Sequence, residues 1–454
     1  MSYDVQTENE YRVGEWLPSD QAILDTWLAE QISAAKEASN PTLPVIKAFQ
    51  ELIESDAQIF MLFNQMFSQV PTKPPYNRNP SLEPQVRDYQ QMLFLLNHIM
   101  TTAPRFSQSG LVGFPINAIL DWSMGTEGGY AAFLHPKVNA MLKRVLNEWG
   151  AFLKSPDSVS VLNEDPDSGW LGDNAMLAMV KAMPEYFDKQ LTANEARKIF
   201  IESFHCDPDK PHYGFTCWDD FFTRTFKVGI RPVAAPDDDN VIVNACESAP
   251  FNHQTNVERT ARFWIKGQPY SLKHMLNDDE LTEQFVGGTV YQAFLSAKSY
   301  HRWNSPISGR IVKAYVTEGT YYSEMPAEGF YNPLHPDPSD PNITPDPSAP
   351  NNSQGYLSEV AARAMIFIEA DNPAIGLMCF MPIGMAEVSS CDISVYEGQH
   401  VNKGDPLGMF HFGGSTHCLI FRPEVNLEFD FHGQKPGLNS HNIAVRAKLA
   451  TVIK

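Results

Sequence analysis

The sequence lacks the cysteine patterns that mark several classes of protein. Its 454 residues contain only six cysteines, and no two of them have the spacing of a CxxC motif. This argues against a zinc ribbon and against a thioredoxin-type redox site. We expect free, mostly buried thiols in a reducing compartment. The histidines are scattered without ligand spacing, so we expect no metal site.

Long apolar segments and an excess of basic residues are also missing. The longest nearly apolar stretch, Ile375 to Met385, has eleven residues, whereas a membrane-spanning helix needs about 20. The first residues are polar and acidic and do not resemble a signal peptide. The formal net charge of −20 argues against binding to nucleic acid and to anionic lipid. We therefore expect a cytoplasmic protein with no nucleic-acid partner and no transmembrane segment. Its oligomeric state cannot be read from the sequence.

What the sequence does contain predicts an α+β fold. Apolar residues make up 43% of the chain, enough for a sizeable core, and the length suggests two or three domains of about 150 residues each. Apolar side chains recur at helical spacing through the first 200 residues, and these stripes should be core. They include Phe49, Ile53, Phe60, Phe63 and Phe67, then Val86 to Met100, then Val138 to Phe152. Thr192 and Glu195 have the spacing of a capping box. We predict a helical N-terminal domain over residues 1–204.

After about residue 235 the segments become short, β-branched or aromatic, and bounded by turn residues. They lie at 241–246, 288–297, 310–317, 365–370 and 408–412. We predict a mostly antiparallel β-domain over residues 205–454. Eight prolines fall between Pro326 and Pro350, a composition that cannot form a ladder or a core. We expect a surface insertion at about 324–355.

One segment near the C-terminus, Phe412-Gly413-Gly414-Ser415-Thr416, is the most informative for chemistry. Its simplest interpretation is a turn in which the serine makes local hydrogen bonds. A phosphate-binding loop would need more glycines and a lysine, and a nucleophile elbow would need G-x-S-x-G. A further interpretation is a serine that attacks its own preceding peptide bond. Glycine before the serine would permit the strained backbone that an N-to-O acyl shift requires.

Two other segments contain candidate site residues. The first is Tyr300-His301-Arg302-Trp303-Asn304, followed by a Pro–Gly turn into a predicted strand. The second is Asn244-Ala245-Cys246-Glu247-Ser248, which places an acid at the end of an apolar strand. A structural histidine and a solvent-facing carboxylate are the simple alternatives to a built site.

Taken together, these segments resemble the phosphatidylserine decarboxylase family. The resemblance runs from about residue 205 to the end. Its further motifs are Phe221-Phe222-Thr223-Arg224, Arg231-Pro232, Lys266-Gly267, Tyr270-Ser271-Leu272, Glu397-Gly398 and Lys403-Gly404-Asp405. The helical first half, with Ser168-Gly169-Trp170-Leu171, is similar to that of the fungal L-tryptophan decarboxylases in this family.

The resemblance implies a pyruvoyl enzyme that processes itself. In the family, the serine hydroxyl attacks the preceding glycine carbonyl, and β-elimination and loss of ammonia leave a pyruvoyl group. Here cleavage would fall between Gly414 and Ser415, giving a small chain of 40 residues, 415–454. The pyruvoyl group derived from Ser415 would be the cofactor. Its ketone would condense with the substrate amine and accept the electron pair released with CO₂.

The family pattern also implies roles for other residues. Glu247 takes the acid position of an acid–His–Ser triad, and His301 takes the position of the proton donor in decarboxylation. The triad histidine is replaced by Asn304, and an amide cannot accept the serine proton. Three outcomes stay open. His301 or another histidine acts as the base; Asn304 only orients while Glu247 works through water; or the chain is not processed. His411 and His417, which flank the cleavage site, are weaker candidates than His301 for the proton donor.

The leading functional hypothesis is a decarboxylase of a free aromatic L-amino acid, tryptophan to tryptamine. Arg302 and Trp303 are candidate substrate-binding residues. One alternative is phosphatidylserine decarboxylation to phosphatidylethanolamine, for which the net charge of −20 is a poor match. Another is an unprocessed pseudoenzyme or interaction protein. A carrier module is disfavoured because we find no hairpin-tip lysine in a modification motif.

Overall fold

The structure is a computed structural model of the chain. It describes residues 21–38, 40–70, 86, 88–107, 114–261, 270–296, 298–324, 353–388, 390–412, 415–437 and 439–453. The predicted Pro-rich insertion and the Lys266-Gly267 motif therefore lie largely or wholly outside the described residues, as do Gly413 and Gly414.

Helices fill the first half of the described chain, as predicted. They are α1 (Gln21–Ala38), α2 (Pro44–Ser55), α3 (Ala57–Ser68), α4 (Tyr89–Ile99), α5 (Pro115–Met124), α6 (Glu127–Leu134), α7 (Pro136–Leu153), α8 (Asp173–Lys181), α9 (Ala193–Ser203) and α10 (Trp218–Phe222). We call α1 to α10 the helical region. Two short helices, α11 (Leu272–Met275) and α14 (Gln354–Val360), lie later in the chain.

One prediction for the helical region is wrong in detail. The apolar stripe from Phe49 to Phe67 does not lie on one continuous helix, because the chain breaks at Asp56. The Asp56 carboxylate accepts hydrogen bonds from the backbone N–H groups of Gln58 and Ile59 and caps α3. The break changes the helical phase, so Ile59 is buried and Phe60 is 41% exposed. Phe60 is therefore not a core residue.

The second half of the chain forms antiparallel sheets. The strands are β1 (Val241–Val243), β2 (Ala249–Gln254), β3 (Thr289–Leu295), β4 (Arg302–Asn304), β5 (Gly309–Thr317), β6 (Arg363–Ala370), β7 (Leu377–Gly384), β8 (Ser390–Ile393), β9 (His400–Val401), β10 (Pro406–His411), β11 (Ser415–Phe421), β12 (Leu427–Phe429) and β13 (Lys448–Val452). We call them the β-region. Together with the helical region they make the predicted α+β fold.

Within the described chain, three sheets make up the β-region. The largest has seven strands in the order β2-β3-β11-β7-β6-β5-β9, and two sheets of three strands have the orders β4-β10-β8 and β1-β13-β12. Strand β11 lies in the interior of the large sheet and pairs with β3 and β7 along all seven of its residues. Each of those seven residues is buried. A strand buried on both faces reads as a nearly continuous apolar run, as Cys418 to Phe421 does.

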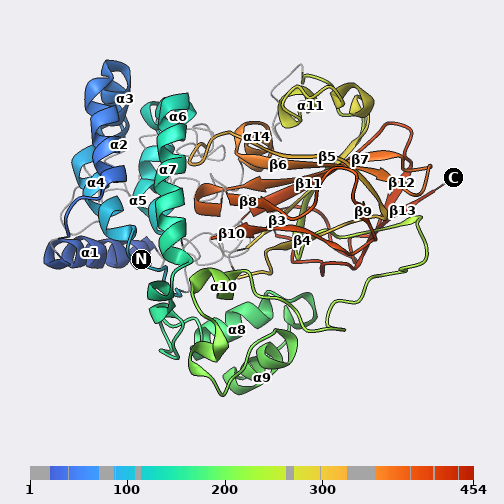
Figure 1. Cartoon of the computed structure of the whole chain (residues 1–454), viewed down its shortest axis with the longest axis horizontal. Helices are drawn as coiled ribbons and strands as arrows, with labels where there is room; N and C mark the ends of the chain where they lie inside the picture. Colours follow the sequence, from blue (N-terminus) through green and yellow to red (C-terminus); the bar gives the residue numbers. More distant parts are fainter. Residues whose placement is uncertain are drawn as a thin grey trace, which may run out of the picture.

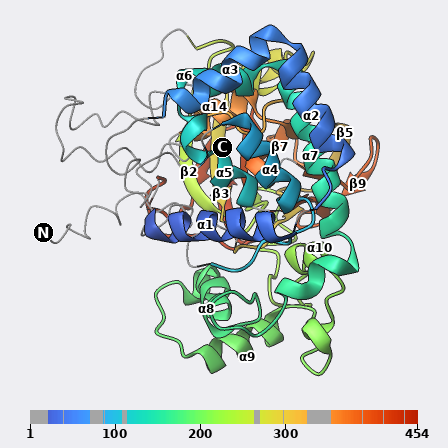
Figure 2. The ribbon, with the colours of Figure 1, turned by 90° about the vertical axis from the view of Figure 1, so that its left-hand side faces the viewer.

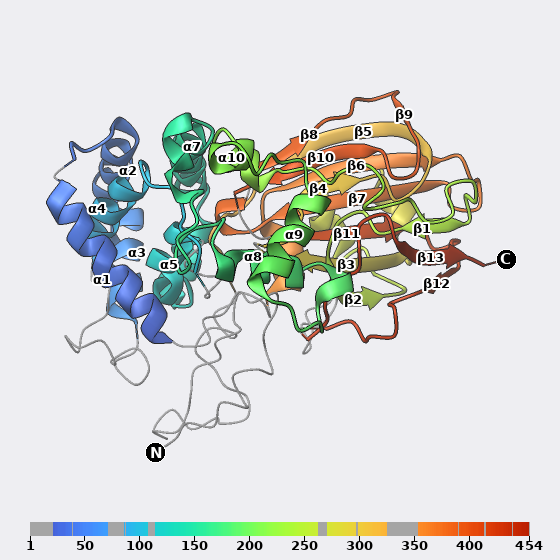
Figure 3. The same ribbon diagram turned by 90° about the horizontal axis from the view of Figure 1, so that it is seen from below.

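The helical region covers one end of the sheets. Figure 1 shows α2 to α7 gathered at that end, while β12 and β13 lie at the opposite end near the C-terminus. The view from the helical end places α1, α2, α4 and α5 in front of the β-region, with α8 and α9 below it (Figure 2). Seen from below, α8, α9 and α10 run along the sheets (Figure 3).

Two hydrophobic clusters correspond to the two regions. Each cluster also contains side chains that come from the other region. Tyr321, Tyr322, Ala386 and Phe412 of the second half belong to the helical cluster. Phe114, from the residue before α5, belongs to the cluster of the β-region. The regions therefore share a packed interface. The domain division between residues 204 and 205 stays a prediction.

The sequence also predicts free, mostly buried cysteines and no transmembrane segment. All six cysteines are free, and four of them are buried. No helix in the described ranges is both long enough and apolar enough to span a bilayer.

The capping box at α9 is confirmed and gives a first prediction. The Thr192 hydroxyl accepts a hydrogen bond from the Glu195 N–H, and the Glu195 carboxylate accepts one from the Thr192 N–H. Replacing Thr192 with Ala should lower the free energy of unfolding by about 1 kcal/mol, because one N-terminal donor of α9 loses its partner. Urea denaturation would measure the change. Thr192→Ser should retain most of the stability, and equal losses in both variants would contradict this assignment.

Candidate active site

Ser415 begins the buried strand β11. Its backbone pairs with Leu295 of β3 and Gly384 of β7. The side chain is fully buried, and its Oγ has no hydrogen-bond partner among the described residues. A buried hydroxyl without a partner costs free energy that a structural serine would avoid. This orphaned hydroxyl is consistent with a reacting group.

The chain changes sheets immediately before Ser415. Strand β10 ends at His411 in a three-stranded sheet, and β11 starts at Ser415 in the seven-stranded sheet. Phe412 lies between them with a φ of 77°, which is strained for a bulky residue. Its ring packs against Trp149 of α7, with 6.3 Å between ring centroids. A Cβ on Gly150 would lie 3.0 Å from the Phe412 ring. The helical region thus holds the strained residue that precedes the Gly-Gly-Ser segment.

His301 lies just before β4 and is also buried. Its ring stacks on Phe222 of α10 at 4.3 Å, and neither ring nitrogen forms a hydrogen bond within the described chain. Burial, together with the nearby Arg224 guanidinium, lowers the pKa of His301 to about 3. The imidazole is therefore neutral near pH 7, with one N–H to donate and one lone pair to accept. Its role as proton donor stays a prediction.

Glu247 is buried in an ion pair rather than exposed at a strand end. Arg231 donates to both of its carboxylate oxygens, at 2.9 Å and 2.5 Å. The Val445 N–H donates to the same carboxylate at 2.9 Å. Arg231 also pairs with Glu185 at 3.0 Å. The acid that the family pattern assigns to the triad is therefore hydrogen-bonded to Arg231, the arginine of the Arg231-Pro232 motif.

Asn304, at the triad histidine position, ends β4. Its amide nitrogen donates to the Gly404 carbonyl at 2.9 Å. Its Oδ1 has no partner among the described residues. The backbone N–H of Asn304 donates to Ala245, two residues before Glu247. The side chain thus fixes the Lys403-Gly404-Asp405 turn, and within the described chain it forms no hydrogen bond with Ser415.

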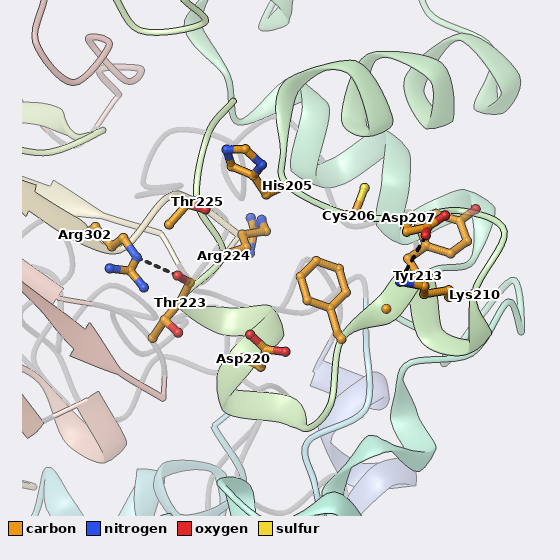
Figure 4. A pocket seen from close by; sticks show the side chains of 12 residues that line it. His205, Cys206, Asp207, Lys210, Tyr213, Asp220, Thr223, Arg224, Thr225 and Arg302 are labelled. Atoms are coloured by element: carbon orange, nitrogen blue, oxygen red, sulfur yellow. Dashed lines mark hydrogen bonds and ion pairs between the residues drawn. The ribbon is translucent and has the colours of Figure 1, made fainter. Parts of the chain in front are cut away.

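The two candidate substrate-binding residues have different environments. Trp303 is fully buried, with its ring edge-on to Phe410 at 4.9 Å and to Phe380 at 5.9 Å. That environment is the core of the β-region. Arg302 lines a cavity of about 320 Å³ beside α10 and donates to the Thr223 carbonyl at 2.6 Å (Figure 4).

The same cavity is lined by Arg224, which the sequence indicated only as part of a family motif and not as a site residue. Arg224 is buried, contacts three phenylalanine rings, and donates only to the carbonyls of Phe221 and Lys298. No ion pair forms at Arg224 or Arg302 within the described chain. Burial lowers the pKa of Arg224 to about 10, and both guanidinium groups can bind an anion such as a carboxylate. Ser415, His301 and Glu247 are not among the residues that line this cavity.

His411 and His417 flank the Gly-Gly-Ser segment in different environments. The two ring nitrogens of His411 face Asp219 at 2.7 Å and Asp392 at 3.3 Å. His417 is fully buried, and its Nε2 lies 3.0 Å from the Ser248 hydroxyl. Ser248 follows Glu247 directly, but its role was not apparent from the sequence, because only folding brings β11 beside it.

A further buried acid lies where the two regions meet. Glu387, in the short 3-10 helix η6 (Ala386–Val388), accepts a hydrogen bond from the Asn117 N–H in the first turn of α5. Its other oxygen has no partner among the described residues. Burial raises the pKa of Glu387 to about 7. The Gly384 backbone, three residues earlier in the chain, pairs with Ser415.

Known proteins are similar in sequence to this chain over nearly its whole length. Two family models, both described as phosphatidylserine decarboxylase, match residues 43–179 and 218–440. An L-tryptophan decarboxylase of Psilocybe cubensis is 35% identical over 442 residues, covering 95% of this chain and 93% of the relative. A decarboxylase of Amanita muscaria, iboD, is 42% identical over 320 residues, covering 70% of this chain and 86% of the relative. Phosphatidylserine decarboxylase proenzyme 3 of Schizosaccharomyces pombe is 29% identical over 53% of this chain and 22% of its own length.

The α+β fold and these relatives define a carboxy-lyase, an enzyme that removes CO₂ from its substrate. The chain belongs to the phosphatidylserine decarboxylase family. The family resemblance inferred from the sequence motifs is therefore confirmed.

The pKa of Glu387 gives a second prediction. Because the folded pKa of about 7 lies above the reference value of 4.5, folding favours the protonated acid. The contribution of Glu387 to the free energy of unfolding should therefore fall by about 3 kcal/mol as the pH rises from 4.5 through 7. Glu387→Gln removes the ionisation. Over that pH interval the parent should lose this stability and the variant should not, so the unfolding free energy of the variant should rise relative to that of the parent. Denaturation at several pH values would measure it, and a constant difference would contradict the prediction.

Proposed function

We propose that this chain is a pyruvoyl-dependent decarboxylase of a free aromatic L-amino acid, with tryptophan as the first substrate to test. The observation that carries the proposal is the buried Oγ of Ser415, which has no hydrogen-bond partner among the described residues; Ser415 starts an interior strand and follows two glycines in the sequence. The near-full-length similarity to the Psilocybe decarboxylase supports the substrate class. We place the enzyme in the cytoplasm.

The surroundings of Ser415 fit a pyruvoyl group formed in place. The opposing residue on β7 is Gly384, which has no side chain to fill the space beside Ser415. Burial excludes bulk water from the position where a reactive ketone would form. When present, such a group supplies an electron sink for the electron pair that CO₂ leaves behind.

The chain also explains how a cleaved 415–454 segment would stay bound. Strand β11 is hydrogen-bonded to β3 and β7, and β13 is hydrogen-bonded to β1, so strands on both sides of the cleavage point are interleaved. Val445 donates to Glu247, and Ile443 exchanges two backbone hydrogen bonds with Ser248. In this proposal the Glu247–Arg231 ion pair has a second use, as part of the contact between the two chains.

Other residues of the site receive roles in the proposal. His301 is the proposed proton donor in decarboxylation, the role that the family pattern gives to its position. Arg302 and Arg224 are candidates to bind the substrate carboxylate through their guanidinium groups. Trp303, buried in the core, would support β4 rather than contact substrate. Asn304 leaves the place of the usual base without a proton acceptor.

Self-processing gives the third prediction. The purified parent should consist of two chains split between residues 414 and 415, with the small chain carrying a pyruvoyl group in place of an N-terminal serine. Ser415→Ala should stay one chain, because the attacking hydroxyl is gone. Intact-mass measurement distinguishes the two forms. Ser394→Ala, at an exposed serine of the β-region, is the matched control and should be cleaved like the parent. A parent that stays uncleaved would refute the pyruvoyl proposal and favour an unprocessed interaction protein.

The substrate class gives the fourth prediction. CO₂ release should occur with free tryptophan and should be absent with phosphatidylserine vesicles and with the Ser415→Ala variant. The formal net charge of −20 disfavours approach to an anionic lipid surface. Since the Amanita relative is named only a decarboxylase, the assay should include phenylalanine, tyrosine and acidic amino acids. Release from vesicles alone would identify the lipid reaction instead.

A further inference from the structure

The family's usual base for self-cleavage is missing here, and the structure offers one histidine on the reacting strand itself. Side chains alternate between the two faces of a strand, so residues two apart point to the same side. Ser415 and His417 are two apart on β11. Their side chains therefore share one face of the seven-stranded sheet, with Cα atoms about 6.7 Å apart.

The neighbours of this pair on β7 have no long side chain, and on β3 Leu295 lies opposite Ser415. The residues opposite Ser415 and His417 on β7 are Gly384 and Pro382, and Ala293 lies opposite His417 on β3. The His417 ring is bounded further along by Tyr291 at 6.1 Å and Phe380 at 5.8 Å. The structure shows no hydrogen bond between the Ser415 Oγ and the His417 Nδ1; at this spacing, side-chain rotation or one bridging water molecule would connect the base and the hydroxyl.

The hydrogen bonds of His417 leave one ring nitrogen available. Nε2 lies 3.0 Å from the Ser248 hydroxyl, whereas Nδ1 has no partner among the described residues. The Ser248 hydroxyl is also within hydrogen-bond distance of the Cys246 carbonyl and the Asn244 Oδ1. If it donates to one of them, it accepts the Nε2–H of His417 and leaves a lone pair on Nδ1. Ser248 itself is fixed by two backbone hydrogen bonds to Ile443.

Glu247, Asn304 and His411 are committed elsewhere, whereas the ring nitrogens of His301 have no partner in the described chain; His301 lies just before β4 and not on the strand of Ser415. Both oxygens of Glu247 are bound by Arg231, and the Asn304 amide holds Gly404. The two nitrogens of His411 face carboxylates. Within the described chain, His417 combines a free ring nitrogen with a position on the strand and face of Ser415.

We propose that His417, oriented by Ser248, is the base that takes the proton of Ser415 during self-cleavage, and that it replaces the histidine absent at Asn304. The inference rests on the proposed pyruvoyl function. Burial lowers the pKa of His417 to about 3, so its ring is neutral near pH 7 and its nitrogen lone pair is not already protonated.

The step balances without any added oxidant or reductant. His417 Nδ1 accepts the hydroxyl proton, and the Ser415 oxygen bonds to the carbonyl carbon of Gly414. The peptide C–N bond breaks, and the released amine takes the proton back from His417. The resulting ester then loses its Cα proton and its carboxylate leaving group by β-elimination. Addition of one water and loss of one ammonia give the pyruvoyl end.

His417→Gln is the direct test and the fifth prediction. Glutamine can place an amide near the Ser248 hydroxyl but cannot accept the serine proton. Cleavage of freshly translated chain, followed by gel electrophoresis and intact mass, should slow by at least about 100-fold. Ser248→Ala should slow cleavage by a smaller factor, about tenfold, because the base remains but loses its orienting hydrogen bond. His253→Gln, at an exposed histidine of β2, is the matched control and should be cleaved at the parent rate.

Two further measurements separate a base from a structural residue. Adding Asn304→His to the His417→Gln chain should restore cleavage at least in part, since it returns a histidine to the family position. Hydroxylamine, which cleaves esters, should not release the 40-residue segment from His417→Gln, because the acyl shift is blocked before an ester forms. Release by hydroxylamine would overturn the assignment of His417 to the first proton transfer.

The remaining outcomes are also decisive. Cleavage of His417→Gln within about threefold of the parent would overturn the inference and leave the proposed function intact. An uncleaved parent would overturn the proposed function itself. If His417→Gln fails to fold, as judged by circular dichroism against Ser415→Ala, the Ser248→Ala rate decides the question. A parent-like rate in that variant would count against the His417–Ser248 pair.

Discussion

The architecture of this protein depends on the burial of one strand. Strand β11 lies between β3 and β7 with every residue buried, and its first residue is the serine to which the family chemistry points. Central position gives the strand hydrogen bonds on both edges, so its register is fixed on both sides. That register places Gly384 opposite Ser415 and sets the face that Ser415 shares with His417. A slip of one residue would turn the serine to the other face.

The helical region takes part in the site through packing rather than through chemistry of its own. Phe412 holds an unfavourable backbone conformation next to the Gly-Gly-Ser segment, and its ring is packed against α7. Tyr322 and Ala386 of the β-region complete the helical core, and Glu387 caps the start of α5. Strain of this kind persists only where surrounding structure enforces it. The helical region therefore supports the geometry in which the serine is presented.

Buried charge in the β-region is paired in a way that joins distant segments. Arg231 and Glu247 neutralise one another and also contact Glu185 and Val445, which lie 46 residues before the arginine and 198 residues after the acid. Removing one partner of such a pair leaves an uncompensated charge in the interior. The ion pair is thus well suited to hold the N-terminal and C-terminal parts of the β-region together around β11.

The sequence by itself determined the α+β class, the capped start of α9, the main strands and the family, because helical period, turn residues and ordered motifs are local properties of the chain. It also singled out Ser415, His301, Glu247 and Asn304 as the residues to consider. It did not reveal the break at Asp56, because one capping carboxylate changes the phase of an otherwise regular apolar stripe. Only the tertiary structure shows that Glu247 binds Arg231 and that Trp303 packs in the core. It also shows that His417 lies within hydrogen-bond distance of Ser248. The physical reason is that these contacts join residues far apart in sequence, and strand register rather than local preference selects them.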